Sequence, residues 1–151
     1  MDFRIDLDPV HRVIRLTVTA AVITLAMAED CYFRLLRVAG RKPGKAEASE
    51  DGPYAAIYDL SVVTGTTLTL DMIRHYARRA PSIPMGRTHV VVGKEPSIHE
   101  LARIFQMCRE FRKGNKFEVV QSLEQAYEMV GAHPEDFMVR LYPEDQADQA
   151  D

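Results

Sequence analysis

The sequence predicts an α/β fold whose sheet is mixed but mostly parallel, with an antiparallel hairpin at its N-terminal end and alternating helices. Apolar and polar residues alternate over 3–7 and 14–18 around Pro9, as in two antiparallel strands with one solvated face. Residues 54–60 and 88–92 are short, mainly apolar runs separated by helical patterns, which is typical of parallel strands covered on both faces. Right-handed crossovers are expected to join them.

The length and composition predict one domain over residues 1–142. A chain of 151 residues with 46% hydrophobic content is long enough to bury a core. Residues 143–151 form an acidic segment that we expect to be disordered. Because much of the net charge of -3 lies in that segment, the remainder is near neutral. A general nucleic-acid binder, which needs a basic surface, is therefore excluded.

The first predicted helix follows the hairpin. Thr24 is placed to cap it, and Gly40 to end it. Its expected buried stripe consists of Leu25, Ala28, Tyr32, Leu35 and Ala39. Residues 41–52 have no periodic apolar residue, which predicts a mobile loop.

Two further helices are predicted between and after the apolar strands. Residues 73–80 carry a helical stripe that Pro81 terminates, and Pro96 suits the first turn of a helix over 97–113. That third helix has one apolar stripe for the core and a second one formed by Ile104, Met107 and Phe111. The second stripe predicts an interface with a dimer mate or a partner, with cover by a loop of the same chain as the alternative.

The C-terminal part is predicted to contain a strand and a helix. Residues 117–120 form a short apolar strand, Ser122 and Gln125 a capping-box pattern, and Gly131 a helix stop. Residues 137–142 are expected to add a short extended piece.

Several patterns predict a cytoplasmic protein without stable membrane insertion. Cys31 and Cys108 lie in helical patterns without metal-ligand or redox spacing, so two reduced thiols are expected, with a disulfide as the alternative. The longest apolar run, 18–28, is too short to span a bilayer, and the first residues lack the regions of a signal peptide.

Two segments resemble a known family. The strand end Asp59-Leu60-Ser61 with Val63-Thr64, and the segment from Val119 through Ser122-Leu-Glu-Gln to Tyr127, combine with the element order to resemble the STAS-like group. In particular, the chain is similar to the small bacterial SpoIIAA-like proteins classed with STAS and SEC14 domains. The similarity covers about residues 3–131. It implies a STAS/SpoIIAA-like fold.

The resemblance also implies a partner-binding loop after the central strand. In anti-sigma antagonist members this loop leads to an Asp-Ser-Ser-Gly helix start whose serine is phosphorylated. This chain has Thr67-Leu68-Thr69-Leu70 there, so a phosphate would fall on Thr66, Thr67 or Thr69, and helix capping by Thr67 and Thr69 is the alternative. The candidate partner-loop residues are Asp59, Ser61, Thr64, Thr66, Thr67 and Thr69.

No residue pattern predicts an enzyme, a metal site or a cofactor. Asp59 is expected to accept N–H bonds from the turn that follows it, and Ser61 lacks the flanking glycines of a nucleophile elbow. The five histidines are scattered without ligand spacing and are expected at surface or edge positions. A basic patch is expected from Arg74, Arg78, Arg79 and Arg87, either as a binding surface or as a solvated face.

Two function hypotheses follow. The first is a non-enzymatic interaction or regulatory module, expected to be a homodimer, that binds a protein partner through the loop after the central strand. The alternative is a SEC14-like carrier or sensor of a lipid or other apolar small ligand, which the seven methionines would favour as adaptable pocket residues. An apolar cavity between the sheet and the helices would favour this alternative, and a filled core would oppose it.

Overall fold

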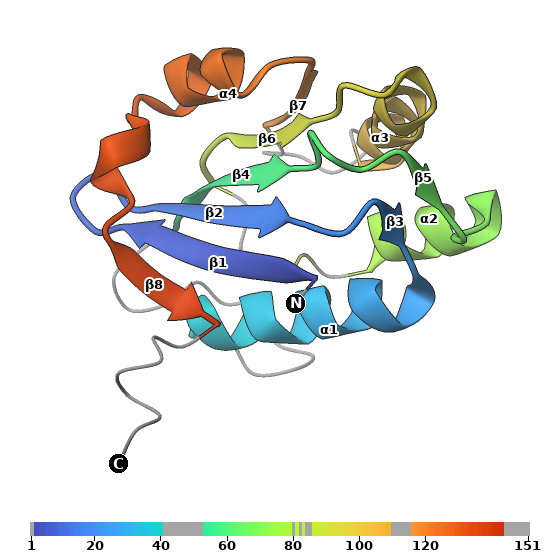
Figure 1. The fold of residues 1–151 in the computed structure, drawn as a ribbon, viewed down its shortest axis with the longest axis horizontal. Helices are drawn as coiled ribbons and strands as arrows, with labels where there is room; N and C mark the ends of the chain where they lie inside the picture. Colours follow the sequence, from blue (N-terminus) through green and yellow to red (C-terminus); the bar gives the residue numbers. More distant parts are fainter. Residues whose placement is uncertain are drawn as a thin grey trace.

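The computed structural model describes residues 2–40, 53–79, 81, 83, 86–109 and 116–143. Within them the chain forms a mixed six-stranded sheet and four α-helices, which confirms the expected α/β class (Figure 1). The strands of this sheet are β1 (Phe3–Asp8), β2 (Val13–Val18), β4 (Ala55–Asp59), β6 (His89–Val92), β7 (Phe117–Val120) and β8 (Val139–Tyr142). The helices are α1 (Leu25–Val38), α2 (Leu70–Arg78), α3 (Pro96–Arg109) and α4 (Leu123–Val130).

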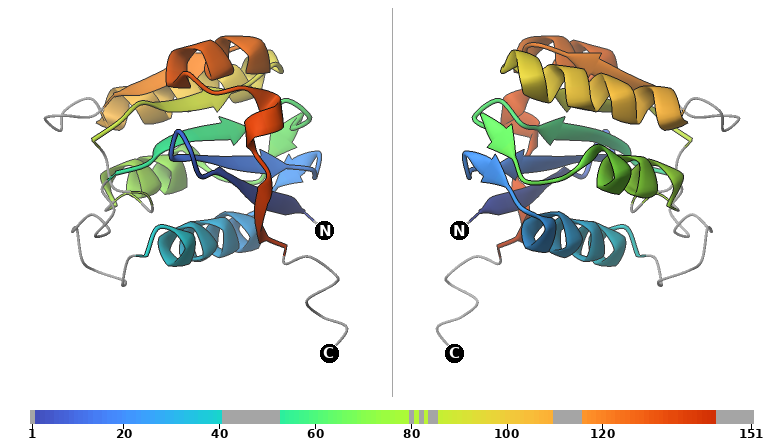
Figure 2. Two further views of the ribbon diagram at one scale, coloured as in Figure 1. Left: turned by 90° about the vertical axis from the view of Figure 1, so that its left-hand side faces the viewer. Right: turned by 90° about the vertical axis from the view of Figure 1, so that its right-hand side faces the viewer.

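The strand order β7-β6-β4-β2-β1-β8 explains where the helices lie. The chain steps from β2 to β4, β6 and β7 in one direction, and these neighbours pair in parallel. Right-handed crossovers that all step in one direction place their helices on the same face of a sheet. Accordingly α1, α2 and α3 cover one face, whereas α4, on the return path to β8, covers the other (Figure 2).

The antiparallel part of the sheet contains three strands. β1 and β2 form the expected hairpin, with Phe3 opposite Val18 and Asp8 opposite Val13. The extended piece expected near the C-terminal end is β8, which pairs antiparallel with β1. The antiparallel edge of the sheet is therefore β8, and both strands of the hairpin have a neighbour on each side.

Local signals place the helix ends. The hydroxyls of Thr24, Thr69 and Ser122 each accept a backbone N–H from the first turn of α1, α2 and α4. Gly131 follows α4 with φ of 72°, a left-handed conformation that glycine adopts without strain. Pro96 opens α3 as expected.

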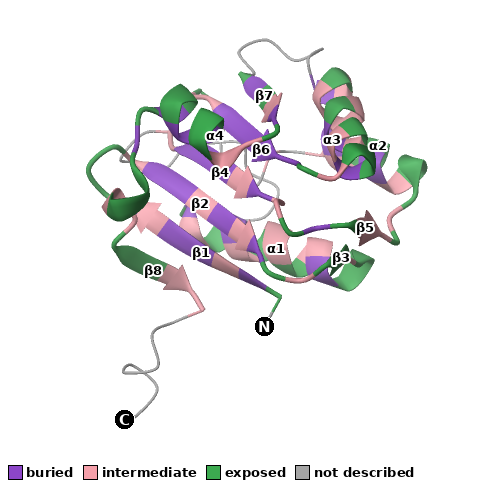
Figure 3. Ribbon diagram, turned by 45° about the horizontal axis from the view of Figure 1, so that its top comes forward, coloured by how far each residue is buried: buried purple, intermediate pink, exposed green. Residues whose placement is uncertain are grey.

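The central strands are buried on both faces (Figure 3). Ala55, Ala56 and Ile57 of β4 are almost fully buried, which confirms that this strand is central and covered on both sides. Since side chains alternate along a strand, Ala56 and Tyr58 face α1, α2 and α3, whereas Ala55 and Ile57 face α4.

The structure differs from the predicted elements in a few places, and some predicted segments lie outside the described residues. The buried stripe of α1 passes through Met27 and Leu35, whereas Leu25, at the first turn, is exposed. A second, two-stranded sheet of β3 (Val22–Ile23) and β5 (Gly65–Thr66) was not predicted, because two-residue strands leave no periodicity. A 3-10 turn, η1 (Pro134–Asp136), precedes β8. The predicted mobile loop at 41–52, the end of the third helix and the acidic segment from 144 onward lie outside the described residues.

In the part of the chain that the structure describes, every helix is too short or too polar to cross a membrane.

Candidate functional site

The loop after β4 begins with a turn that Asp59 stabilises. One carboxylate oxygen of Asp59 accepts the backbone N–H of Ser61 at 3.0 Å and also accepts the Ser61 hydroxyl. This is the structural use expected for Asp59. These two contacts hold the Ser61 hydroxyl next to the Asp59 carboxylate, within the turn.

The threonines of this loop hold the small β3–β5 sheet together. The Thr66 hydroxyl donates to the Ile23 carbonyl at 2.8 Å and accepts the N–H of Leu68 at 3.0 Å. The Thr64 hydroxyl donates to the Ala21 carbonyl, and Thr69 caps α2. Thr67, by contrast, is exposed and does not cap α2. These hydrogen bonds give the loop a fixed shape.

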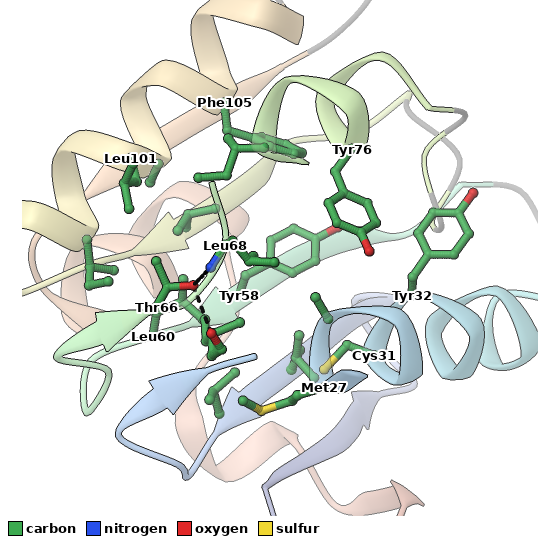
Figure 4. Close-up of a pocket in the computed structure, with 18 of the residues that line it drawn as sticks. Met27, Cys31, Tyr32, Tyr58, Leu60, Thr66, Leu68, Tyr76, Leu101 and Phe105 are labelled. Atoms are coloured by element: carbon green, nitrogen blue, oxygen red, sulfur yellow. Dashed lines mark hydrogen bonds between the residues drawn. The ribbon is translucent and has the colours of Figure 1, made fainter. Parts of the chain in front are cut away.

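That shape brings Thr66 and Leu68 into the wall of a pocket, which Figure 4 shows in close-up. The pocket has a volume of about 270 Å³ and lies between the sheet and α1, α2 and α3. We call it the apolar pocket. Side chains from β2, β4, α1, α2, α3 and the β5 loop line it, among them Leu16, Met27, Tyr32, Tyr58, Leu60, Ile73, Tyr76, Val91, Ile98, Leu101, Ala102, Phe105 and Phe117.

Arg109 differs from the other described residues that line the apolar pocket, because it alone carries a charged side chain. It is the last described residue of α3 and is only 7% exposed, and its guanidinium carbon lies 4.8 Å from the centre of the Phe105 ring. A buried cation is costly unless anionic or aromatic groups compensate it. The Phe105 ring supplies part of this compensation for Arg109.

Tyr58 and His89 form a buried polar pair beside Arg109. The Tyr58 hydroxyl lies 3.1 Å from Nδ1 of His89, which is 1% exposed. Burial, together with the charge of Arg109, lowers the pKa of His89 to about 4, so this imidazole is neutral at pH 7. Burial also raises the pKa of Tyr58, an effect that Arg109 partly opposes. The expectation that the histidines occupy surface or edge positions was wrong for His89.

Cys31 lies in the wall of the same pocket on α1. Burial, followed by the charges of Asp30 and Asp2, raises the pKa of its thiol to about 12. The thiol is therefore protonated and a weak nucleophile. Cys31 and Cys108 are both free, as expected from their spacing.

A polar bridge between α1 and α2 borders the pocket. Glu29 accepts a hydrogen bond from the Tyr76 hydroxyl and pairs with Arg79 at 3.3 Å, and Arg79 also stacks on the Tyr32 ring at 3.9 Å. The hydrogen bond from Tyr76 and the charge of Arg79 lower the pKa of Glu29 despite some desolvation. Tyr32 of α1 and Tyr76 of α2 both line the pocket (Figure 4). The bridge therefore ties together the two helices on either side of the pocket.

The expected basic patch is only partly formed. Arg78 and Arg79 share a shallow depression with His75, but Glu29 lies in the same depression and pairs with Arg79. Arg74 pairs with the exposed carboxylate of Asp71 at 3.6 Å. The prediction was wrong for Arg87, because its guanidinium donates to the carbonyls of His11 and Arg12 in the β1–β2 turn.

The second stripe of α3 faces away from the core in its described part. Met107 is 63% exposed and Ile104 is half-buried, whereas Phe111 lies outside the described residues. On the other side of α3, Ile98 and Ala102 are buried and Leu101 and Phe105 line the apolar pocket.

One group of potential metal ligands, not visible in the sequence, comes together among the described residues. Asp8, His11 and Asp136 have ligand atoms within 4.8 Å of one another. Internal hydrogen bonds account for this group: Asp8 accepts the N–H groups of Val10 and His11 and contacts Nδ1 of His11 at 2.7 Å. Asp136 accepts the N–H of His133. Nδ1 of His11 also lies 3.7 Å from a carboxylate oxygen of Asp136, so the group joins η1 to the β1–β2 turn.

A comparison of the chain with family models, curated proteins and solved structures gave no match. The resemblance to STAS and SEC14 domains accordingly stays a prediction.

Proposed function

We propose that the protein is a non-enzymatic carrier or sensor that binds a small apolar ligand in the apolar pocket. The observation that carries this proposal is the pocket itself, a space of about 270 Å³ where a filled core would otherwise be expected. Protein interiors are close-packed, so voids well above the size of a water molecule are uncommon. Concave, mainly apolar pockets with a few polar groups are the usual form of small-ligand sites.

The size of the pocket limits the ligand. An engineered apolar cavity of about 150 Å³ binds benzene, so a pocket of about 270 Å³ has room for roughly ten to twelve non-hydrogen atoms. A single short acyl chain or a small ring system fits this space. A phospholipid with two long chains exceeds it, so the proposed ligand is smaller than the lipid expected for a SEC14-like carrier.

The first experiment is a native mass measurement on the protein purified gently from its own cells. A carrier is expected to show additional noncovalent mass that is lost on denaturation. A bare protein whose NMR spectrum is also unchanged by octanol would contradict the proposal.

A pair of alanine variants on α1 locates the binding. Ala28 lines the apolar pocket, whereas Ala26 on the same helix is exposed. Ala28→Phe is expected to fill the pocket and to weaken octanol binding at least about tenfold, because roughly 1.4 kcal/mol of lost binding free energy is a tenfold change. Ala26→Phe is the matched control and should leave binding unchanged. Equal binding by both variants would place the ligand elsewhere.

A partner-binding role is the second candidate, and the exposed Met107 on α3 favours it. The loop after β4 links ligand binding to partner binding in this proposal, because Thr66 and Leu68 line the pocket and the neighbouring Thr67 is exposed to a partner.

Replacement of Ile104, Met107 and Phe111 by alanine is expected to weaken self-association or partner binding. An unchanged solution mass would remove self-association through this surface.

A further inference from the structure

Aromatic rings from several elements line the apolar pocket. Each of the three helices on this face contributes one ring: Tyr32 from α1, Tyr76 from α2 and Phe105 from α3. Two strands contribute one ring each, Tyr58 from β4 and Phe117 from β7. Figure 4 shows Tyr58, Tyr76 and Phe105 reaching the pocket from three different elements. Because no single element supplies them, the aromatic lining is a feature of the assembled pocket.

These rings favour a ligand that is itself a ring. Phe105 and Phe117 lie with their ring centroids 5.3 Å apart and their planes at 43°, within the usual range for interacting aromatic pairs. Aromatic pairs attract each other beyond the effect of buried area, a contribution that a saturated chain of the same size does not gain. A rigid ring also loses less conformational freedom on binding than an alkyl chain does.

The Tyr58 hydroxyl is the polar group that can orient such a ligand. Tyr58 lines the pocket and keeps some accessible surface, although it lies on the central strand. Its hydroxyl meets Nδ1 of His89 at 3.1 Å. A phenolic hydroxyl can donate one hydrogen bond and accept others, so this single contact leaves it further capacity. The Thr66 hydroxyl, by contrast, already donates to Ile23 and accepts from Leu68.

The lining favours a neutral ligand. Arg109, which carries the charge among the described lining residues, stacks on Phe105 and has a further interaction of its own, so it is not a spare counter-charge for a ligand. Burying an ion without a counter-charge is costly. A ligand hydroxyl suits Tyr58 whichever tautomer His89 adopts, because a hydroxyl both donates and accepts.

From these observations we propose that the ligand of the apolar pocket is a small neutral aromatic compound with one hydroxyl group, its ring among Tyr76, Phe105 and Phe117 and its hydroxyl at Tyr58. This inference rests on the proposed function and specifies the ligand class. A phenol with two fused rings meets the size limit derived above.

The first test compares an aromatic probe with its saturated counterpart. 2-Naphthol and decahydro-2-naphthol share one carbon skeleton and one hydroxyl, and both are titrated into the full chain at pH 7 and followed by NMR. 2-Naphthol is expected to bind at least about fivefold more tightly. Phe105→Leu should lower this preference about twofold or more. Phe33→Leu, which changes an exposed ring of α1 outside the pocket lining, should retain it.

The second test assigns the hydroxyl contact to Tyr58, with naphthalene as the probe that lacks a polar group. Tyr58→Phe keeps the ring and should lower the affinity for 2-naphthol relative to naphthalene about fivefold, the effect of one net hydrogen bond. Tyr142→Phe removes a hydroxyl on β8, outside the pocket lining, and should leave this ratio unchanged. Naphthalene binding by Tyr58→Phe shows that its pocket is intact.

The outcomes separate this inference from the proposed function. Equal or tighter binding of decahydro-2-naphthol to the unmodified protein would overturn the aromatic class, and an unchanged ratio in Tyr58→Phe would overturn the hydroxyl contact. Either result leaves the apolar pocket as a ligand site. Absence of binding by octanol and by all these probes would overturn the proposed function as well. If neither pocket variant folds, the comparison of the two naphthols on the unmodified protein decides the ligand class.

Discussion

The two faces of the sheet are packed in different ways, although the same strands supply both. On the α4 face, β-branched and small residues of β4 and β6 meet Ala126 and Tyr127 of one short helix in a buried apolar layer. On the opposite face, α1, α2 and α3 surround the apolar pocket. The α4 face is a structural core, whereas the other face combines a core near α1 with the apolar pocket.

The buried charged groups of the two faces also have different surroundings. On the α4 face, the Asp6 carboxylate accepts hydrogen bonds from Arg15 at 3.1 Å and Arg140 at 2.7 Å, and Arg15 in turn donates to the Tyr127 hydroxyl. These bonds join β1, β2, β8 and α4. On the pocket face, the charge of Arg109 adjoins an open space. The buried ionic groups on the α4 face therefore join several elements of the fold, whereas Arg109 borders the apolar pocket.

The largest effect is expected from breaking the Asp6 network. Asp6→Asn removes the negative charge that Arg15 and Arg140 share and leaves their positive charges without it. We expect a loss of about 3 kcal/mol in the free energy of unfolding, less than for a fully buried pair because Arg140 is half exposed. Urea unfolding at pH 7 measures it.

The control for this change is Asp71→Asn, which alters an exposed ion pair with Arg74 on α2. No measurable change in stability is expected there. Equal losses in both variants would show that Asp6 stabilises the fold no more than a surface carboxylate does.

A comparable effect is expected from acid on the pocket face. The pKa of His89 is about 4 in the folded protein and about 6.5 in an unfolded chain. Between these values the unfolded chain takes up a proton that the folded protein does not, so stability falls as the pH is lowered from 6.5 to 4. The loss reaches on the order of 3 kcal/mol at pH 4, and above pH 6.5 this group has no effect.

The contribution of His89 is isolated by comparing slopes of stability against pH. His89→Gln should flatten the slope between pH 6 and 4.5 by up to about 1.4 kcal/mol per pH unit. His75→Gln changes an exposed histidine and is the comparison variant, so the slope should flatten more in His89→Gln than in His75→Gln. If His89→Gln retains the full slope, the buried imidazole is not the group responsible.

The smallest expected change in stability comes from two neighbouring valines of β6. They compare the two faces directly, because one valine lies on each face. Val90 is fully buried on the α4 face, and Val91 lines the apolar pocket. Val90→Ala should cost about 2 kcal/mol in unfolding free energy, and Val91→Ala about 1 kcal/mol, because its side chain already borders empty space. Only Val91→Ala should alter octanol affinity. A reversed order would contradict the difference in packing between the two faces.

The sequence predicted the fold through local signals. Caps at Thr24, Thr69 and Ser122 and the stop at Gly131 act within one helical turn, so they are visible without tertiary structure. The strand β8 was expected only as an extended piece, because its pairing with β1 joins residues more than 130 positions apart.

The site was predicted in part. Asp59 accepts an N–H bond from the turn after β4 and Thr69 caps α2, both as expected, whereas the expected capping by Thr67 is not observed. The loop also lines the apolar pocket through Thr66 and Leu68, and its expected role in partner binding stays a prediction. Tyr58, His89 and Arg109 were missed, because each looks like an ordinary strand or helix residue. The methionine argument for a carrier was largely wrong: Met27 lines the pocket, but Met107, Met129 and Met138 are exposed.

By itself, the sequence determined the order of the main-sheet strands and the four helices, the caps of α1, α2 and α4 and the burial of the central strand, because these depend on neighbours within a few residues or on the period of two or 3.6. Tertiary structure decided the strand order, the exclusion of α4 from the pocket face and the meeting of Tyr58, His89 and Arg109 beside one cavity. The physical reason is that a cavity is a property of how closely helices approach a sheet, and side chains from β4, β6 and α3 set that distance only when they are packed together.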